Sequence, residues 1–285
     1  MNVIHRTVVH YRRRPRASGS RITAHSERSR RQPWVGVEKQ YGFSLTTQYA
    51  GDMGPSGQPA RQREQMLLEA GYDPRSVLTV RQTHSRTVAD LRGETDMTAR
   101  LDDGRVPEAD GILFDPVVQA AGVTVADCMP ILLVPCMQGI EQGRTKPRWN
   151  GLESATPRVA ALLHSGYKGT GIVTDALNHI EDACGVPASQ MRAVLGPCIA
   201  GACYAVPAER AEAFRAAFGE GAAWHEEDAS YIDLRAANLN LLEAAGVPEI
   251  MVIENCTHCD PRLGSYRRDG AGFTRMLAIA GPFGG

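Results

Sequence analysis

The sequence predicts a globular protein in which helices and strands are mixed without a regular βαβ alternation. Short apolar runs bounded by turn residues predict strands, and amphipathic segments that end at a glycine predict helices. Because the two kinds of segment do not alternate strictly, a doubly wound parallel sheet is disfavoured. No G-x-G-x-x-G fingerprint follows a strand and no Walker lysine motif occurs, so NAD and P-loop chemistry are disfavoured too.

Composition fits one large domain or two small ones. The 285 residues are 43% hydrophobic and 22% charged, which is ample for a buried core. No apolar run approaches the roughly 20 residues that span a bilayer. The opening segment lacks the apolar stretch of a secretory signal. We therefore expect a soluble, cytoplasmic protein without a membrane partner.

Charge divides the chain into two parts. Residues 1–33 carry nine arginines and one acid, Glu27, so the remainder holds 22 basic and 31 acidic side chains, a net charge of about −9. Nucleic-acid binding rests on neutralising phosphates, so such an acidic body argues against a nucleic-acid partner. We expect residues 1–33 to be a disordered basic tail and residues 34–285 to form one catalytic domain.

The first half of that domain is predicted to be rich in strands. A Gly/Pro-rich loop at 51–59 precedes an amphipathic helix at 60–70, which Gly71 ends. Residues 93–108 and 138–156 are polar or Gly/Pro-rich and are expected to be loops. Strands are predicted at 77–80, 109–114, 122–126, 131–134 and 159–163.

The second half is predicted to be rich in helices. A glycine-bearing turn at 166–171 leads into a helix at 172–184, and Gly185 is its stop signal. Further helices are expected at 208–218 and 234–245. Strands are predicted at 191–195, 250–253 and 274–280.

Three of these strands lead directly to a possible metal ligand: His84, Cys128 and His164. Two imidazoles and one thiolate suit zinc, and three protein ligands leave one coordination position open, as in catalytic sites. Separations of 44 and 36 residues match no local zinc-finger spacing. Spacing alone therefore leaves two hydrogen-bonded structural histidines and a buried core cysteine as the competing interpretation.

The remaining cysteines give no clear pattern. Seven cysteines, an odd number in a chain without an export signal, do not predict a disulfide framework. Cys256 and Cys259 form a C-x-x-C with His258 between them. Since no second C-x-x-C exists, the sequence favours a loop with incidental thiols over a zinc site.

A series of motifs over roughly residues 41–280 resembles the YfiH, or laccase-domain, family. Members have been called multicopper polyphenol oxidases and, more recently, zinc-dependent purine nucleoside phosphorylases with adenosine deaminase activity. The matching segments are Gln82-Thr83-His84, Ala109-Asp110-Gly111, Ala126-Asp127-Cys128-Met129-Pro130, His164-Ser165-Gly166-Tyr167-Lys168-Gly169, Gly196-Pro197-Cys198-Ile199, Cys256-Thr257 and Ser265-Tyr266-Arg267-Arg268-Asp269-Gly270.

The resemblance implies a fold and an activity. The fold is α+β, with four α/β/β/α layers and two mixed sheets, similar to the catalytic domains of toxin deamidases. His84, Cys128 and His164 would bind a catalytic Zn²⁺. The reaction would be phosphorolysis of adenosine-, inosine- or guanosine-type nucleosides to base and ribose 1-phosphate, together with adenosine deamination. The partners would be the nucleoside and inorganic phosphate, and we expect a monomer or homodimer.

Phosphate binding is expected from residues near the third ligand. The turn at 166–171 precedes a helix, where backbone N–H groups attract anions, and Lys168 adds a charge. Tyr266 and Arg267 are further candidates; for the turn, close packing is the competing explanation. The chain has Ser165, Tyr167 and Lys168 where the family usually has His-Ala-Gly-Trp-Arg-Gly, and it has Ala205 where many members have glutamate.

Two other activities compete. A copper-dependent polyphenol oxidase would use the same trio with Cu²⁺. The whole chain has eight histidines, too few for a four-copper enzyme. A Cys-His amidohydrolase would use Cys128 as nucleophile and His164 or His84 as base.

Overall fold

The computed structural model describes residues 5–9, 34–38, 42–55, 58–94, 106–136 and 158–282. The strands are β1 (His5–Val9), β2 (Trp34–Glu38), β3 (Phe43–Thr46), β4 (Val77–Leu78), β5 (Val88–Asp90), β6 (Gly111–Phe114), β7 (Ala120–Val125), β8 (Met129–Pro135), β9 (Ala160–Ser165), β10 (Met191–Leu195), β11 (Ala205–Val206), β12 (Ala223–Glu226), β13 (Ala229–Ile232), β14 (Glu249–Ile253) and β15 (Met276–Ala280). The helices are α2 (Gln58–Glu69), α4 (Ile172–Cys184), α5 (Ala208–Phe218), α6 (Leu234–Ala244) and α7 (Tyr266–Asp269), with short 3-10 turns such as η5 (Gly201–Cys203).

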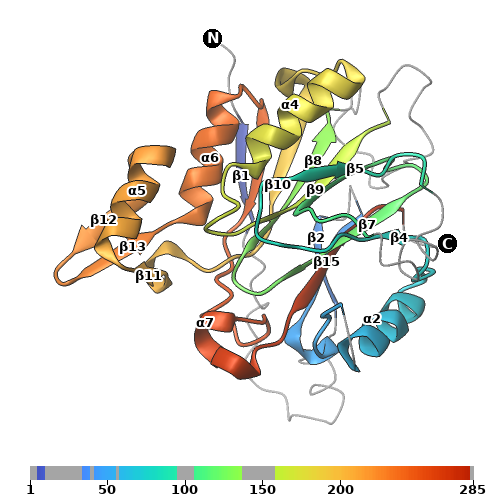
Figure 1. The fold of residues 1–285 in the computed structure, drawn as a ribbon, viewed down its shortest axis with the longest axis horizontal. Coiled ribbons are helices and arrows are strands. Elements are labelled where there is room, and N and C mark those ends of the chain that lie inside the picture. Colours follow the sequence, from blue (N-terminus) through green and yellow to red (C-terminus); the bar gives the residue numbers. More distant parts are fainter. Residues whose placement is uncertain are drawn as a thin grey trace, which may run out of the picture.

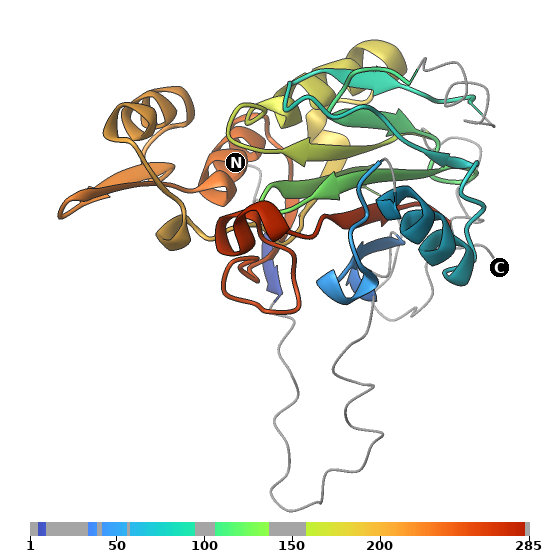
Figure 2. The ribbon, with the colours of Figure 1, turned by 60° about the horizontal axis from the view of Figure 1, so that its bottom comes forward.

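Two mixed sheets form the centre of the molecule (Figures 1 and 2). The larger has seven strands in the order β1-β14-β10-β8-β9-β6-β5, and the smaller has five in the order β2-β3-β15-β7-β4. Each combines parallel and antiparallel pairs, for example β10 with β14 and β10 with β8 in the larger sheet. The expected pair of mixed sheets is therefore confirmed.

Strand β8 shows why the larger sheet is buried on both faces. Leu132 and Val134 pack between the two sheets, in one cluster with Phe43 and Val123 of the smaller sheet. Ile131 and the residues that alternate with it face α4 and α6 on the opposite side. A strand buried on both faces is expected to be continuously apolar, as β8 is.

Helices cover the outer faces of both sheets. Ile172 and Leu177 of α4 pack on the larger sheet. On the smaller sheet, Leu67 of α2 packs with Leu277 and Ile279 of β15. These contacts give the expected four layers, and Figure 2 shows α4 on one side of the paired sheets.

A third, three-stranded sheet was not expected from the sequence. It runs in the order β11-β13-β12, and Figure 1 shows it projecting with α5 at one side of the molecule. Phe214 of α5 packs against Ile232 of β13. Strands β12 and β13 are only four residues long, too short for a period of two to be detected in the sequence.

The N-terminal region requires one correction. Residues 5–9 were expected in the disordered tail, but they form β1 and pair in parallel with β14. Three successive β-branched residues, Thr7, Val8 and Val9, favour this extended segment. The rest of 1–33 and the expected loop at 138–156 lie outside the described residues. Within the described part of the chain, no helix is long and apolar enough to cross a membrane.

Candidate metal centre

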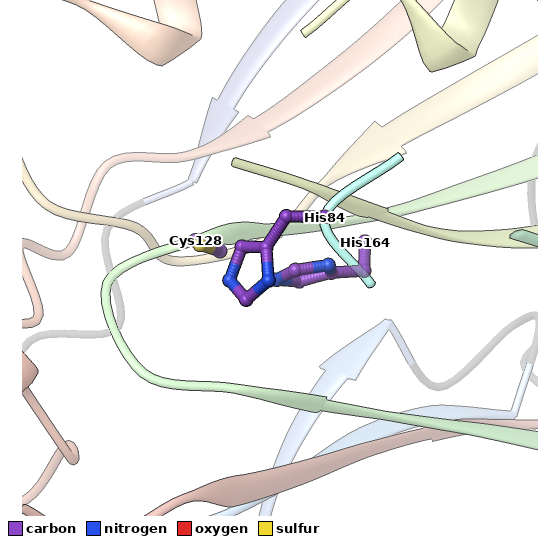
Figure 3. Close-up of side chains that lie close together, drawn as sticks. All are labelled: His84, Cys128 and His164. Carbon is purple, nitrogen blue, oxygen red and sulfur yellow. The ribbon is translucent and has the colours of Figure 1, made fainter. Parts of the chain in front are cut away.

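The three expected ligands converge in space (Figure 3). The ligand atoms of His84, Cys128 and His164 all lie within 4.8 Å of one another. The two imidazole rings meet edge to face, with centroids 4.9 Å apart. His84 is exposed and Cys128 partly so, whereas His164 is 3% exposed. The cluster therefore opens to solvent on the side of His84.

Two of the ligands lie where the chain passes from one sheet to the other. His84 lies between β4 of the smaller sheet and β5 of the larger. Cys128 is the last residue of the turn that joins β7 of the smaller sheet to β8 of the larger. His164 lies within β9, opposite Pro130 of β8. The centre thus lies at the junction of the two sheets.

The turns at these two crossings have an unusual backbone conformation. His84 has a φ of 60° and Asp127, next to Cys128, has a φ of 78°. For residues other than glycine the left-handed region costs about 1 kcal/mol or more, and it persists where surrounding contacts impose it. Here it turns the ligands toward one another.

Asp110 supplies those contacts on the His84 side. Its carboxylate is fully buried. Oδ2 accepts hydrogen bonds from the Ser85 backbone N–H (2.6 Å) and hydroxyl (2.9 Å), and from the Thr83 N–H (3.1 Å). Oδ1 accepts the His84 N–H at 3.0 Å and lies 2.8 Å from Nδ1 of His164. One carboxylate therefore fixes both histidine-bearing segments.

This contact also determines the tautomer of His164. An ionised carboxylate only accepts hydrogen bonds, so Nδ1 must carry the proton that it donates to Asp110. Nε2 is the ring nitrogen left to face Cys128; it donates to the thiolate when His164 is protonated and would give up that proton to bind a metal ion. A histidine that ligates a metal commonly has such a carboxylate behind it.

The electrostatic environment of the centre favours a negatively charged Cys128 thiolate beside a positively charged His164. Burial by itself would raise the pKa of Cys128, but the positive charge of His164 and hydrogen bonds from both histidines lower it to about 6. Burial opposes the charge on His164 as well, yet the Cys128 thiolate and Asp110 raise its pKa to about 10. Asp110 is buried too, and its hydrogen bonds from His164 and Ser85 hold its pKa well below the usual range.

Gly166 makes room for the thiolate. A Cβ at this position would lie 2.7 Å from Cys128 Sγ and 3.5 Å from His84 Cδ2. The first distance is shorter than any ordinary contact, so only glycine fits here without displacing the sulfur. The turn after β9 is therefore glycine-bearing because the centre needs the space.

Asp127 connects the cysteine to the C-terminal part of the chain. Its Oδ1 accepts the hydroxyl of Thr257 at 2.6 Å, and its Oδ2 accepts the Arg267 backbone N–H at 2.7 Å. Both donors come from the segment between β14 and β15. The position of Cys128 therefore depends on residues about 130 positions away in the chain.

Among the expected substrate residues, Arg267 is linked to the centre through its backbone N–H, which binds Asp127 next to Cys128. Its guanidinium donates to the carbonyl of Ala205 at 2.9 Å and lies 5.0 Å above the ring of Tyr204. Burial and then the negative charge of Cys128 raise the pKa of Tyr204 to about 12.

Lys168 and Tyr266 lie in other surroundings. Lys168 is exposed and lines a shallow pocket of about 290 Å³ with Tyr167 and residues of α5. Tyr266 is 59% exposed and packs edge to face on Phe273. At the start of α4, Asp175 forms a two-point ion pair with Arg86. That carboxylate occupies part of the helix N-terminus where the sequence suggested a phosphate.

The sequence assigned no role at the site to the carboxylates of Asp110 and Asp127. Asp110 and Asp127 both occur in the family-like motifs, but nothing in their local sequence shows which side chains they bind. Their one local signal is an acidic residue bordering an apolar strand, since carboxylates are rarely buried unless they are paired. The structure reveals their partners.

The donor set fits zinc. Two imidazole nitrogens and a thiolate are typical zinc ligands, and neighbouring ligands of a tetrahedral ion lie about 3.5 Å apart. The 4.8 Å upper limit for these atoms therefore needs only small side-chain adjustments. Three ligands would leave a fourth position toward the exposed side.

Comparison with known proteins agrees with this arrangement. A family model described as multi-copper polyphenol oxidoreductase laccase matches residues 43–140 and 152–281. The adenosine deaminase RL5 of an unknown prokaryotic organism is 32% identical over 212 residues, covering 68% of this chain and 70% of that protein. The purine nucleoside phosphorylase Rv2149c of Mycobacterium tuberculosis is 30% identical over 212 residues, covering 74% of each.

A solved structure confirms the architecture. The crystal structure of YlmD from Geobacillus stearothermophilus matches with a TM-score of 0.72 at 23% identity, covering 88% of this chain and 96% of that one. Fold and site thus define a four-layer α+β protein with a candidate metal centre between its sheets. The chain belongs to the multi-copper polyphenol oxidoreductase laccase family, the laccase-domain proteins that its motifs resemble.

Proposed function

We propose that the protein is a zinc-dependent purine nucleoside enzyme. It would split adenosine-, inosine- or guanosine-type nucleosides with phosphate, giving the base and ribose 1-phosphate, and would also deaminate adenosine. The observation that carries this proposal is the convergence of His84, Cys128 and His164 on one point, with Asp110 behind His164. The names of two relatives, a purine nucleoside phosphorylase and an adenosine deaminase, support the substrate class.

The residues of the centre have separate roles in this proposal: some would hold the ion and others position those ligands. His84, Cys128 and His164 would hold the ion, which supplies Lewis-acid chemistry and an activated water when bound. Asp110 keeps Nδ1 of His164 protonated, so that Nε2 faces the ion. Asp127 is a positioning residue, because its two hydrogen bonds fix the turn that carries Cys128.

Arg267 is the best-placed phosphate candidate. Its guanidinium is exposed, keeps N–H groups beyond the bond to Ala205, and lies beside Tyr204, while its backbone N–H binds Asp127 next to Cys128. A planar guanidinium binds phosphate oxygens in pairs. Lys168 and Tyr266 are retained as weaker candidates, since one borders the α5 pocket and the other packs on Phe273.

A Cys-His hydrolase is the second candidate, and one observation favours it. The Cys128 thiolate, His164 and Asp110 form a chain like that of a cysteine nucleophile with its base and orienting carboxylate. The activity of such a hydrolase would survive removal of the metal, whereas the activity of the zinc enzyme would not. A multicopper oxidase has less support, because eight histidines in the whole chain cannot furnish four copper sites.

The test is activity with controlled metal content. The purified protein is incubated with adenosine and with inosine, with and without phosphate, and base, ribose 1-phosphate and ammonia are measured. We expect phosphate-dependent release of base that is lost in His84→Ala and Cys128→Ala. His225→Ala on β12 and Cys136→Ala after β8 are matched controls, and both should retain activity.

Metal removal separates the candidates. Chelation should abolish nucleoside cleavage, and zinc should restore it. Activity that persists after complete chelation would reject the zinc proposal in favour of the thiol nucleophile. Restoration by copper alone, with oxidation of phenols, would favour the oxidase.

A further inference from the structure

A second group of metal-ligating side chains lies outside the centre described above. Cys203, at the end of η5, and Cys259, after β14, have their sulfur atoms 3.4 Å apart. With a ring nitrogen of His258, these ligand atoms all lie within 4.8 Å of one another. Two segments that are 56 residues apart in the chain therefore meet at this cysteine cluster.

Cys256 places a third thiol beside the cysteine cluster. Its sulfur accepts the Ala200 backbone N–H at 3.2 Å. It lies next to the cluster but outside the group of ligand atoms that are all within 4.8 Å of one another. Backbone bonds fix the two segments independently of the thiols: Cys198 and Cys256 form a parallel bridge, and the Thr257 N–H donates to the Cys198 carbonyl at 3.1 Å. The thiols are thus brought together by the fold.

From this geometry we infer that Cys203, Cys256, His258 and Cys259 form a second metal site that takes a zinc ion in a structural role. Cys203, His258 and Cys259 already lie together, and Cys256 would complete a tetrahedral set of three cysteines and one histidine by turning toward them, which leaves no open position. The C-x-x-C spacing of Cys256 and Cys259 is typical of such sites. The sequence did not predict the site because Cys203 lies alone in a distant segment.

The second ion would hold in place the segment that binds Asp127, next to Cys128 of the first centre. Thr257 lies between two of the ligands, and its hydroxyl is a donor to Asp127, next to Cys128. Cys203 immediately precedes the three-stranded sheet. The ion would therefore tie that sheet and the β14–β15 segment to the cysteine turn, without touching substrate.

The test uses cobalt in a chain that lacks the first centre. Full-length His84→Ala/Cys128→Ser protein is stripped of metal under reducing conditions and titrated with Co²⁺. We expect one cobalt per chain, thiolate-to-cobalt charge-transfer absorption and tetrahedral visible bands, all displaced by Zn²⁺. Adding Cys203→Ser or Cys259→Ser should abolish the signal, and adding Cys136→Ser should leave it unchanged.

Two results would overturn the proposal. One is a folded His84→Ala/Cys128→Ser protein, checked by circular dichroism, that gives no thiolate–cobalt absorption. The other is a Cys203–Cys259 disulfide found by mass spectrometry in protein kept reduced. The parent titration decides the matter even if an added serine variant does not fold. Since no catalytic activity is measured, failure of the nucleoside proposal would leave this result unaffected.

Discussion

At the scale of single residues, the buried carboxylate of Asp110 links the two candidate histidine ligands. It accepts hydrogen bonds from the turn around His84 and orients the ring of His164 at the same time. A neutral amide offers only one acceptor oxygen, so it cannot make both sets of bonds. Metal affinity should therefore respond to this residue although it is not itself a ligand.

Asp110→Asn should weaken zinc binding about 10- to 100-fold, the range seen when the outer partner of a ligating histidine is removed. Competition against a chromophoric chelator measures the affinity. Asp175→Asn, which alters a half-exposed ion pair with Arg86, is the control and should bind zinc normally. Equal affinities in both variants would contradict the role given to Asp110.

Gly166→Ala should also reduce metal binding, because its Cβ would lie 2.7 Å from the sulfur of Cys128. We expect the ion to be lost or bound at least about 10-fold more weakly. Gly272→Ala, where a Cβ would meet no atom within 4 Å, is a matched control. Metal analysis of both purified variants gives the answer; full zinc occupancy in Gly166→Ala would refute the packing argument.

The pKa values of the centre predict the reactivity of the metal-free protein. With the pKa of Cys128 lowered to about 6, the thiolate dominates at pH 7 and is lost as the pH falls through 6. Alkylation by iodoacetamide, followed by peptide mass analysis at residue 128, should therefore show a midpoint near pH 6. An ordinary thiol titrates at about 8.5, so a midpoint there would contradict the thiolate–imidazolium pair.

At the scale of elements, α7 and the loop before it contain two adjacent arginines with different roles. The guanidinium of Arg268 donates to the carbonyls of Thr257 and Leu263 at 2.8 Å each, whereas Arg267 leaves its guanidinium exposed near Tyr204. Arg268 therefore holds the loop, and Arg267 is available for a ligand.

Substituting each arginine by alanine should separate these roles. Arg268→Ala should lower the free energy of unfolding by about 1 to 3 kcal/mol, because buried carbonyls lose their donor. Arg267→Ala should leave stability nearly unchanged and raise the KM for phosphate. Denaturant titration and phosphate-dependent kinetics measure the two effects. A loss of stability in Arg267→Ala together with a raised KM for phosphate in Arg268→Ala would contradict these roles.

Elements with a clear stop signal were predictable, and the elements that complete the site were less so. Helices α4 and α5 and strand β10 begin and end at the predicted residues, because a glycine follows each of them directly. Strands β12 and β13 are only four residues long and were missed. The ligands could be proposed only through a family resemblance, since their proximity depends on the packing of two sheets.

At the scale of the whole molecule, the apolar layer between the sheets carries much of the stability. Leu132 of β8 lies in this layer and is 1% exposed. Leu132→Ala should lower the free energy of unfolding by about 2 to 5 kcal/mol, the range for a buried leucine that leaves a cavity. Val118→Ala, at a side chain that is 66% exposed, is the control and should change it little. A similar small change in both would show that the layer tolerates a cavity.

The side chain of Gln82 has a further consequence for the molecule. Its amide donates to the Thr124 carbonyl at 2.9 Å and accepts the Thr124 N–H at 2.7 Å, so it pairs with β7 as a strand backbone would. The turn that carries His84 is thereby anchored to the smaller sheet, while His164 belongs to the larger one. The distance between the side chains of His84 and His164 therefore depends on how the two sheets are positioned relative to each other. A core substitution far from the ligands that shifts one sheet on the other would change metal affinity, and one beneath α4 that leaves the sheets in place would not.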